Sequence, residues 1–184
     1  MFFIGIITDK NSEINIKKIM KDKLDKSEII FLNKDNLENF RNVKFDSIVI
    51  NNKIEDKYIL SKIMEKSKYI LYNSDIKDNC ETQGNLSNFI SYGYNSNANV
   101  TISSVTDDNY LLCIQGNISG YNKTTCMQEV RFKKERSNIN VYDGMIATII
   151  DLIYNKWKIR KIAQKLKNIQ KNNFLCRQNW KNIV

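Results

Sequence analysis

Four short apolar runs predict buried strands in the first 75 residues. They are the runs 2–8, 28–33, 45–51 and 68–73. Runs of this length, rich in Ile, Phe and Val, are typical of strands that are covered on both faces of a sheet.

Helical patterns separate these runs. A first helix is predicted after Ser12, its expected N-cap, because apolar residues recur at helical spacing from Ile16 to Leu24. Shorter helical patterns follow at 35–40 and 58–64. Strands that alternate with helices predict a parallel, Rossmann-like sheet with helices across both faces.

The pattern changes after residue 88, where strand candidates follow one another without a good helical window. These candidates are 89–92, 99–105, 109–115 and 125–133. In the second of them, side chains alternate between two faces. Val100, Ile102 and Val105 are expected to face the core, whereas Thr101 and Ser103 are expected to face away from it.

A hairpin and a final helix complete this half. Asp107 and Asp108 predict a hairpin turn, and either Asn138 or Asn140 is the expected cap of a helix over 141–154. The predicted fold class is therefore α/β, with a Rossmann-like parallel sheet, an antiparallel β-rich second part and C-terminal helices.

Composition supports a folded chain and no membrane span. The 184 residues suit one domain, and a hydrophobic content of 42% is typical of globular packing. The absence of proline and the abundance of Lys, Asn and Ile are typical of an AT-rich genome. No basic region precedes the first apolar run, and no run approaches the roughly 18–20 apolar residues of a membrane span. A cytoplasmic protein is the expectation.

The cysteine and histidine counts exclude the commonest metal sites. The four cysteines are scattered without a C-x-x-C pair, and histidine is absent. Free thiols in a reducing compartment are therefore expected, with no metal and no cofactor. General acid–base chemistry near neutral pH would depend on a tuned Cys, Lys or carboxylate.

Four segments carry a family resemblance, which covers residues 45–154 in matching order and at roughly matching spacing. They are Phe45 to Asn52, Tyr69 to Asp75, Tyr92 to Thr101 and Ile139 to Ala147. They resemble, in order, the "Y-D-x-A-V-x-T-N" strand, the "V-L-N-x-D-D" strand, the "T-Y-G-F-S, A-D-V" segment and the "H-N-V-Y-N-A-L-A-A" helix start of Mur ligases, the peptidoglycan amino-acid ligases. The resemblance implies the fold of their central domain.

The resemblance also shows what this chain lacks. Mur ligases hold the ATP phosphates in a glycine-rich loop, G-T-x-G-K followed by Ser or Thr, whose backbone N–H groups and lysine surround the phosphates. Here the first strand is followed by Asp9-Lys10-Asn11-Ser12. The family's histidine after the "T-N" strand is missing as well. ATP-dependent ligase activity is therefore not expected.

Three residues are candidates for ligand binding. In Mur ligases, the asparagine of the "H-N" pair lies near the adenine of ATP, and Asn140 matches it in this chain; the alternative is that Asn140 caps the helix that begins at Val141. Asp75 follows a predicted strand at the end where open α/β sheets bind ligands. Tyr92 ends another strand and is either a binding or a packing residue.

The end of the chain is basic. Nine of the 29 basic residues lie in 152–184, which contains no acidic residue, so the remaining basic residues equal the 20 acidic ones. We predict an α/β domain at 1–154 and a basic helical tail at 155–184. The candidate polyanion-binding residues are Lys156, Lys158, Arg160, Lys161, Lys165 and Lys167. A solvated helix face, a membrane surface and a protein groove are the alternatives.

Three functions fit these observations. The first is a non-catalytic homologue of Mur ligases that acts as a binding or scaffold protein, linked to the cell envelope or to development in a bacterium. The second is a nucleotide- or small-molecule-binding protein, or a remodelled enzyme, with a pocket at the carboxyl ends of the strands. The third is a protein that binds nucleic acid or another anionic surface through the basic tail.

Overall fold

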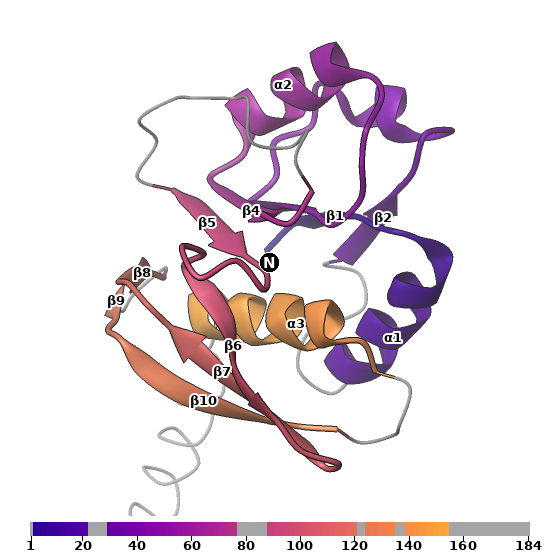
Figure 1. Ribbon diagram of the computed structural model, residues 1–184. Helices are drawn as coiled ribbons and strands as arrows, with labels where there is room; N and C mark the ends of the chain where they lie inside the picture. The colour runs from indigo at the N-terminus through magenta and orange to yellow at the C-terminus, as the bar shows by residue number, and fades with distance from the viewer. Residues whose placement is uncertain (1, 22–28, 77–87, 121–123, 135–138, 155–184) are drawn as a thin grey trace, which may run out of the picture.

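The computed structural model describes residues 2–21, 29–76, 88–120, 124–134 and 139–154 (Figure 1). Within these residues the main feature is an eight-stranded sheet with the order β10-β7-β6-β5-β4-β3-β1-β2. Its strands are β1 (Ile4–Ile7), β2 (Ile29–Leu32), β3 (Ser47–Ile50), β4 (Tyr69–Asn73), β5 (Phe89–Tyr92), β6 (Val100–Val105), β7 (Asn109–Ile114) and β10 (Gln128–Lys133). Beside it, β8 (Ile118–Ser119) and β9 (Thr124–Thr125) form a two-stranded sheet.

The parallel half is organised around β1. It pairs in parallel with β2 on one side and with β3 on the other, and β4, β5 and β6 continue the parallel order beyond β3. The next two strands of the chain, β2 and β3, therefore lie on opposite sides of β1. This is the doubly wound order 2-1-3-4-5, in which the chain switches direction between β1 and β3.

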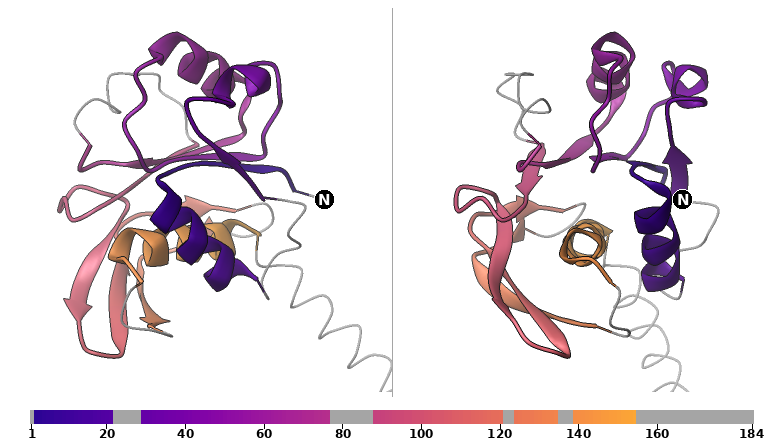
Figure 2. Two further views of the ribbon diagram at one scale, coloured as in Figure 1. Left: turned by 90° about the vertical axis from the view of Figure 1, so that its right-hand side faces the viewer. Right: turned by 45° about the vertical axis from the view of Figure 1, so that its right-hand side comes forward.

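Helices cover both faces of the sheet. The helices α1 (Lys10–Met20) and α3 (Val141–Tyr154) lie on one face, and α2 (Lys57–Lys66) lies on the other with the 3₁₀ helix η2 (Leu37–Phe40) (Figure 2). Alternate residues of a buried strand serve the two cores: Val49 packs on the side of α1 and α3, and its neighbours Ile48 and Ile50 pack on the side of α2. The predicted α/β class is confirmed. Among the described residues no helix is both long and apolar enough to cross a membrane.

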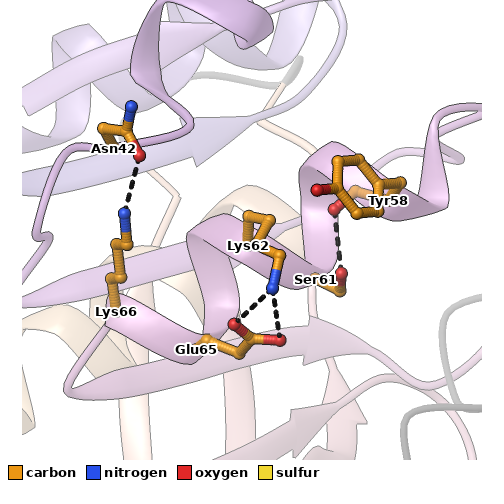
Figure 3. A network of polar contacts seen from close by, with 6 residues as sticks. All are labelled: Asn42, Tyr58, Ser61, Lys62, Glu65 and Lys66. Carbon is orange, nitrogen blue, oxygen red and sulfur yellow. Dashed lines mark hydrogen bonds and ion pairs between the residues drawn. The ribbon is translucent and has the colours of Figure 1, made fainter.

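Polar contacts cap α2 and link it to a neighbouring loop, while its buried residues Leu60, Ile63 and Met64 pack on the sheet. Asp56 caps the helix by accepting a hydrogen bond from the Ile59 backbone N–H at 3.0 Å. On the outer surface, Lys62 forms an ion pair with Glu65, and Lys66 donates to the Asn42 side chain at 2.7 Å (Figure 3). The bond to Asn42 ties the helix to the loop that follows η2. The exposed ion pair itself contributes little to stability.

The antiparallel half continues the same sheet, and its β6 strand differs from the prediction. β7 pairs antiparallel with β6 and with β10, and the Asp107–Asp108 turn joins β6 to β7 as predicted. The β6–β7 register shifts between Ile102 and Ser104, which marks a bulge. Beyond the bulge Val105 lies opposite Tyr110, so it stays on the same face of the sheet as Ile102, which lies opposite Leu112. Val105 was expected to be buried but is 55% exposed at the last position of β6, next to the turn, and Thr101, which was expected to face away from the core, is buried.

Two other boundaries were predicted wrongly. Helix α1 begins at Lys10 and is capped by Asp9, so Ser12 is a buried residue within the helix and not its cap. The predicted strand 125–133 is divided, because residues 126 and 127 leave the ladder between β9 and β10. The predicted helix over 141–154 is confirmed, and the tail at 155–184 lies outside the described residues.

Candidate functional site

The carboxyl ends of the parallel strands carry a network of amide and hydroxyl groups. Asn51, which follows β3, is its centre. Its Oδ1 accepts from the Tyr92 hydroxyl at 3.0 Å and from Asn73 Nδ2 at 3.2 Å, while its Nδ2 donates to Thr8 Oγ1 at 3.1 Å. The network therefore links the ends of β1, β3, β4 and β5. The sequence signal for this role was an asparagine placed directly after an apolar strand.

The start of α1 is already occupied by a carboxylate. Asp9 Oδ1 accepts hydrogen bonds from the backbone N–H groups of Asn11 at 2.8 Å and Ser12 at 3.0 Å. A helix N-terminus that follows the first strand is the position where a phosphate group binds in nucleotide-binding α/β proteins. In this chain the carboxylate of Asp9 binds these N–H groups and places its own negative charge where the charge of a phosphate would lie.

A second carboxylate, that of Asp75, accepts hydrogen bonds from another pair of backbone N–H groups. Its carboxylate accepts from the backbone N–H groups of Tyr94 at 2.7 Å and Asn95 at 3.1 Å, and from the Tyr142 hydroxyl at 2.9 Å. These bonds tie the end of β4 to the β5–β6 loop and to the start of α3. Burial, and next the hydrogen bond to Asp75, raise the pKa of Tyr142, so its hydroxyl remains a donor at physiological pH. An exposed ring, that of Tyr94, packs edge-on against Tyr142.

The three predicted ligand-binding residues have different positions in the structure. Asn140 caps α3: its Oδ1 accepts from the Tyr142 N–H at 3.2 Å, and its carbonyl accepts from the Gly144 N–H at 3.2 Å. Asp75 reaches the same helix start through Tyr142. Tyr92 is fully buried, and its hydroxyl bonds within the core. All three make internal bonds, and ligand binding by them stays a prediction.

A buried carboxylate that the sequence did not single out lies between α1 and α3. Asp143 has no exposed surface, and its Oδ2 accepts from Asn15 Nδ2 at 2.9 Å. Its Oδ1 has no hydrogen-bond partner among the described residues. Burial raises the pKa of Asp143, while Asn15, Ser12 and the Asn140 backbone act in the opposite direction. The sequence signal for Asp143 was its position in the first turn of a predicted helix. That position does not reveal that the carboxylate is buried, because burial depends on the packing of α1 against α3.

Replacing Asp143 with asparagine should stabilise the protein at neutral pH. The pKa of Asp143 is higher in the folded state than the ordinary 3.8, so the folded protein retains this proton to higher pH than the unfolded chain. The free energy of unfolding of the parent therefore falls as the pH rises from about 4 through the folded pKa. The gain from Asp143→Asn should be small near pH 4 and about 1 kcal/mol, or 2–4 °C in Tm, at pH 7.

Thermal melting of the parent and variant from pH 4 to 8 measures this difference. Asp107→Asn is the matched control, because Asp107 is exposed in the β6–β7 turn and the same change there should leave Tm unaltered at every pH. A gain for Asp143→Asn that did not vary with pH would contradict a buried, titrating carboxylate.

A pocket of about 400 Å³ also lies at the edge of the sheet that the carboxyl ends of the parallel strands form. It lies over the carboxyl ends of β1, β2 and β3, where the chain switches direction. Its lining comes from Ile7 and Thr8, the segment 32–34, Leu37, the segment 52–56 and Ile59. A pocket at the carboxyl ends of the strands was one of the predicted features, but the three predicted ligand-binding residues do not line this one. Only the strand order places these three loops together.

Metal chemistry has no visible basis in the part of the chain that the structure describes. It contains no group of three or more Cys, Asp or Glu side chains that could hold a metal ion. Cys113 and Cys126 are free thiols, and Cys80 and Cys176 lie outside the described ranges. The predicted polyanion-binding residues 156–167 also lie outside them, and their role stays a prediction. No family model matches the chain, and neither does any curated protein.

Proposed function

We propose that this protein is a non-catalytic relative of the Mur ligases that acts as a cytoplasmic binding or scaffold protein. The proposal depends on the motif resemblance over 45–154 and on the absence of the family's phosphate loop and histidine. The observation that supports it most is the carboxylate of Asp9, which accepts the N–H groups of Asn11 and Ser12 at the start of α1. A γ-phosphate brought to this position would meet a negative charge in place of free donors.

A second carboxylate supports the same proposal. Asp75 takes the backbone donors of Tyr94 and Asn95 at the end of the neighbouring strands. Phosphoryl transfer depends on positioned N–H groups, a lysine and a metal ion around the transferred phosphate. In this chain the N–H groups at these two positions bind the carboxylates of Asp9 and Asp75, and the sequence has no histidine for the family's water and metal chemistry. A protein of this kind retains a scaffold without the reaction.

The protein should neither hydrolyse ATP nor be stabilised by it. We expect phosphate release in the presence of ATP and Mg²⁺ to equal the background rate, and Tm to stay within about 1 °C of its value without nucleotide. Asp75→Ala and Asn140→Ala serve as the matched variants in both assays. Turnover above background that either variant abolishes would contradict the proposal.

The basic tail remains a separate candidate for an interaction. Uncompensated charge in 152–184 would favour an anionic polymer, and affinity for such a partner should fall steeply with salt because bound counterions are released. Heparin and duplex DNA are suitable probes for a comparison of the full chain with a chain that ends at residue 170.

A further inference from the structure

We propose that the pocket at the ends of β1, β2 and β3 is a binding site for an uncharged nucleobase or nucleoside. This inference deepens the proposed binding role, on which it rests, by naming the site and the ligand class. It is carried by the position of the pocket, the balance of charge in its lining and the mixture of apolar and amide groups.

The pocket lies where the strand order of the sheet leaves a crevice between neighbouring loops. The connection from β1 to β2 crosses the face of α1, whereas the connections from β2 to β3 and from β3 to β4 cross the opposite face. Loops that leave adjacent strands in opposite directions separate, and the crevice between them is the usual ligand site of an open α/β sheet. A volume of about 400 Å³ lies in the range of small-molecule pockets and towards its lower end.

The charges in the lining disfavour a phosphorylated ligand. Lys34 and Lys53 contribute two positive charges, and Glu55 and Asp56 contribute two negative ones, so their formal sum is zero. The start of α2 faces the same loop, but the Asp56 carboxylate already accepts from the Ile59 N–H there. A polyanion would therefore gain no net charge attraction and would find a carboxylate at the helix start.

The remaining groups suit a flat ring with polar edges. Leu37 is buried beside the half-buried side chains of Ile54 and Ile59, which gives the pocket apolar walls. Asn33, Asn52 and Thr8 add amide and hydroxyl groups. The Asn33 and Asn52 side-chain oxygens accept backbone N–H groups of their own loops, so the amide orientations are fixed and their NH₂ groups are left to donate. Apolar faces combined with acceptor-rich edges are the chemistry of nucleobases.

Methyl-labelled protein provides the direct test. Isoleucine δ1-methyl resonances of the full chain would be recorded with adenosine, guanosine, cytidine or uridine, and Ile→Val variants would assign Ile7, Ile54 and Ile59. At least one nucleoside should shift these three resonances and leave Ile146, in the opposite core, unmoved. At about ten times Kd it should raise Tm by about 3–6 °C. No shift with any of the four, or shifts that do not include the pocket isoleucines, would overturn the inference.

Charge and shape are tested by two further comparisons. The triphosphate of the nucleoside that binds should bind at least tenfold more weakly, and equal or tighter binding would overturn the inference. Ile54→Trp should fill the pocket and abolish nucleoside binding, whereas Ile14→Trp, on the exposed side of α1, should not. If Ile54→Trp does not fold, Asn52→Ala replaces it, with an expected loss of at least fivefold in affinity. Failure of these tests leaves the absence of ATP turnover untouched, so this inference and the proposed function can fail separately.

Discussion

Replacing Val100 with aspartate should unfold the protein or bring it close to unfolding. Val100 has no exposed surface, pairs with Tyr92 on one side and with Ile114 on the other, and lies where the parallel half of the sheet meets the antiparallel half. A carboxylate there would be buried without a partner, which costs several kcal/mol. Because whole domains are stable by only about 5–15 kcal/mol, we expect a loss of about 4 kcal/mol or more in urea unfolding.

The control is the same substitution, valine to aspartate, at Val105. Val105→Asp introduces an identical side chain on the same strand, but Val105 is 55% exposed beyond the bulge. Its expected effect is below about 0.5 kcal/mol. If Val105→Asp were as destabilising as Val100→Asp, the exposed position of Val105 at the end of β6 would be contradicted.

Replacing Gly93 with valine should destabilise the protein by roughly 2–4 kcal/mol. A Cβ at Gly93 would lie 2.6 Å from Asp75 Oδ2, and the backbone φ of +157° is one that other residues rarely adopt. The carboxylate would have to move and would lose its bonds to the Tyr94 and Asn95 N–H groups. Urea unfolding measures the loss, and Gly116→Val is the matched control.

A double substitution separates the clash from the backbone effect. The Cβ of Gly116→Val would have only the Asn99 side chain nearby, at 3.7 Å, so a small change is expected there. If contact with Asp75 causes the loss, Gly93→Val should cost at least 1 kcal/mol less in an Asp75→Ala background than in the parent. Strictly additive effects would show that Asp75 is not the obstacle.

The candidate site illustrates which features a sequence can reveal. Asp75 became a candidate because it follows a predicted strand, and Asn140 because it matches the asparagine of the "H-N" pair in Mur ligases and precedes a predicted helix. The missing phosphate loop was equally visible, because it is a contiguous motif. Asn51 and Asp143 were not singled out, since their roles arise from contacts with residues far along the chain. The local signals, an asparagine after a strand and an aspartate in a first helical turn, do not specify these contacts.

The sequence by itself determined the elements and the fold class of this protein. Apolar runs and helical spacing depend on neighbouring residues, so β1 to β5 and α3 lie within a few residues of their predicted positions. The tertiary structure decided the strand order, the β6 bulge and the pocket beside β1. These features depend on which strands pair and in what register. Pairing energies come from residues distant in sequence, and several orders bury the same apolar runs equally well.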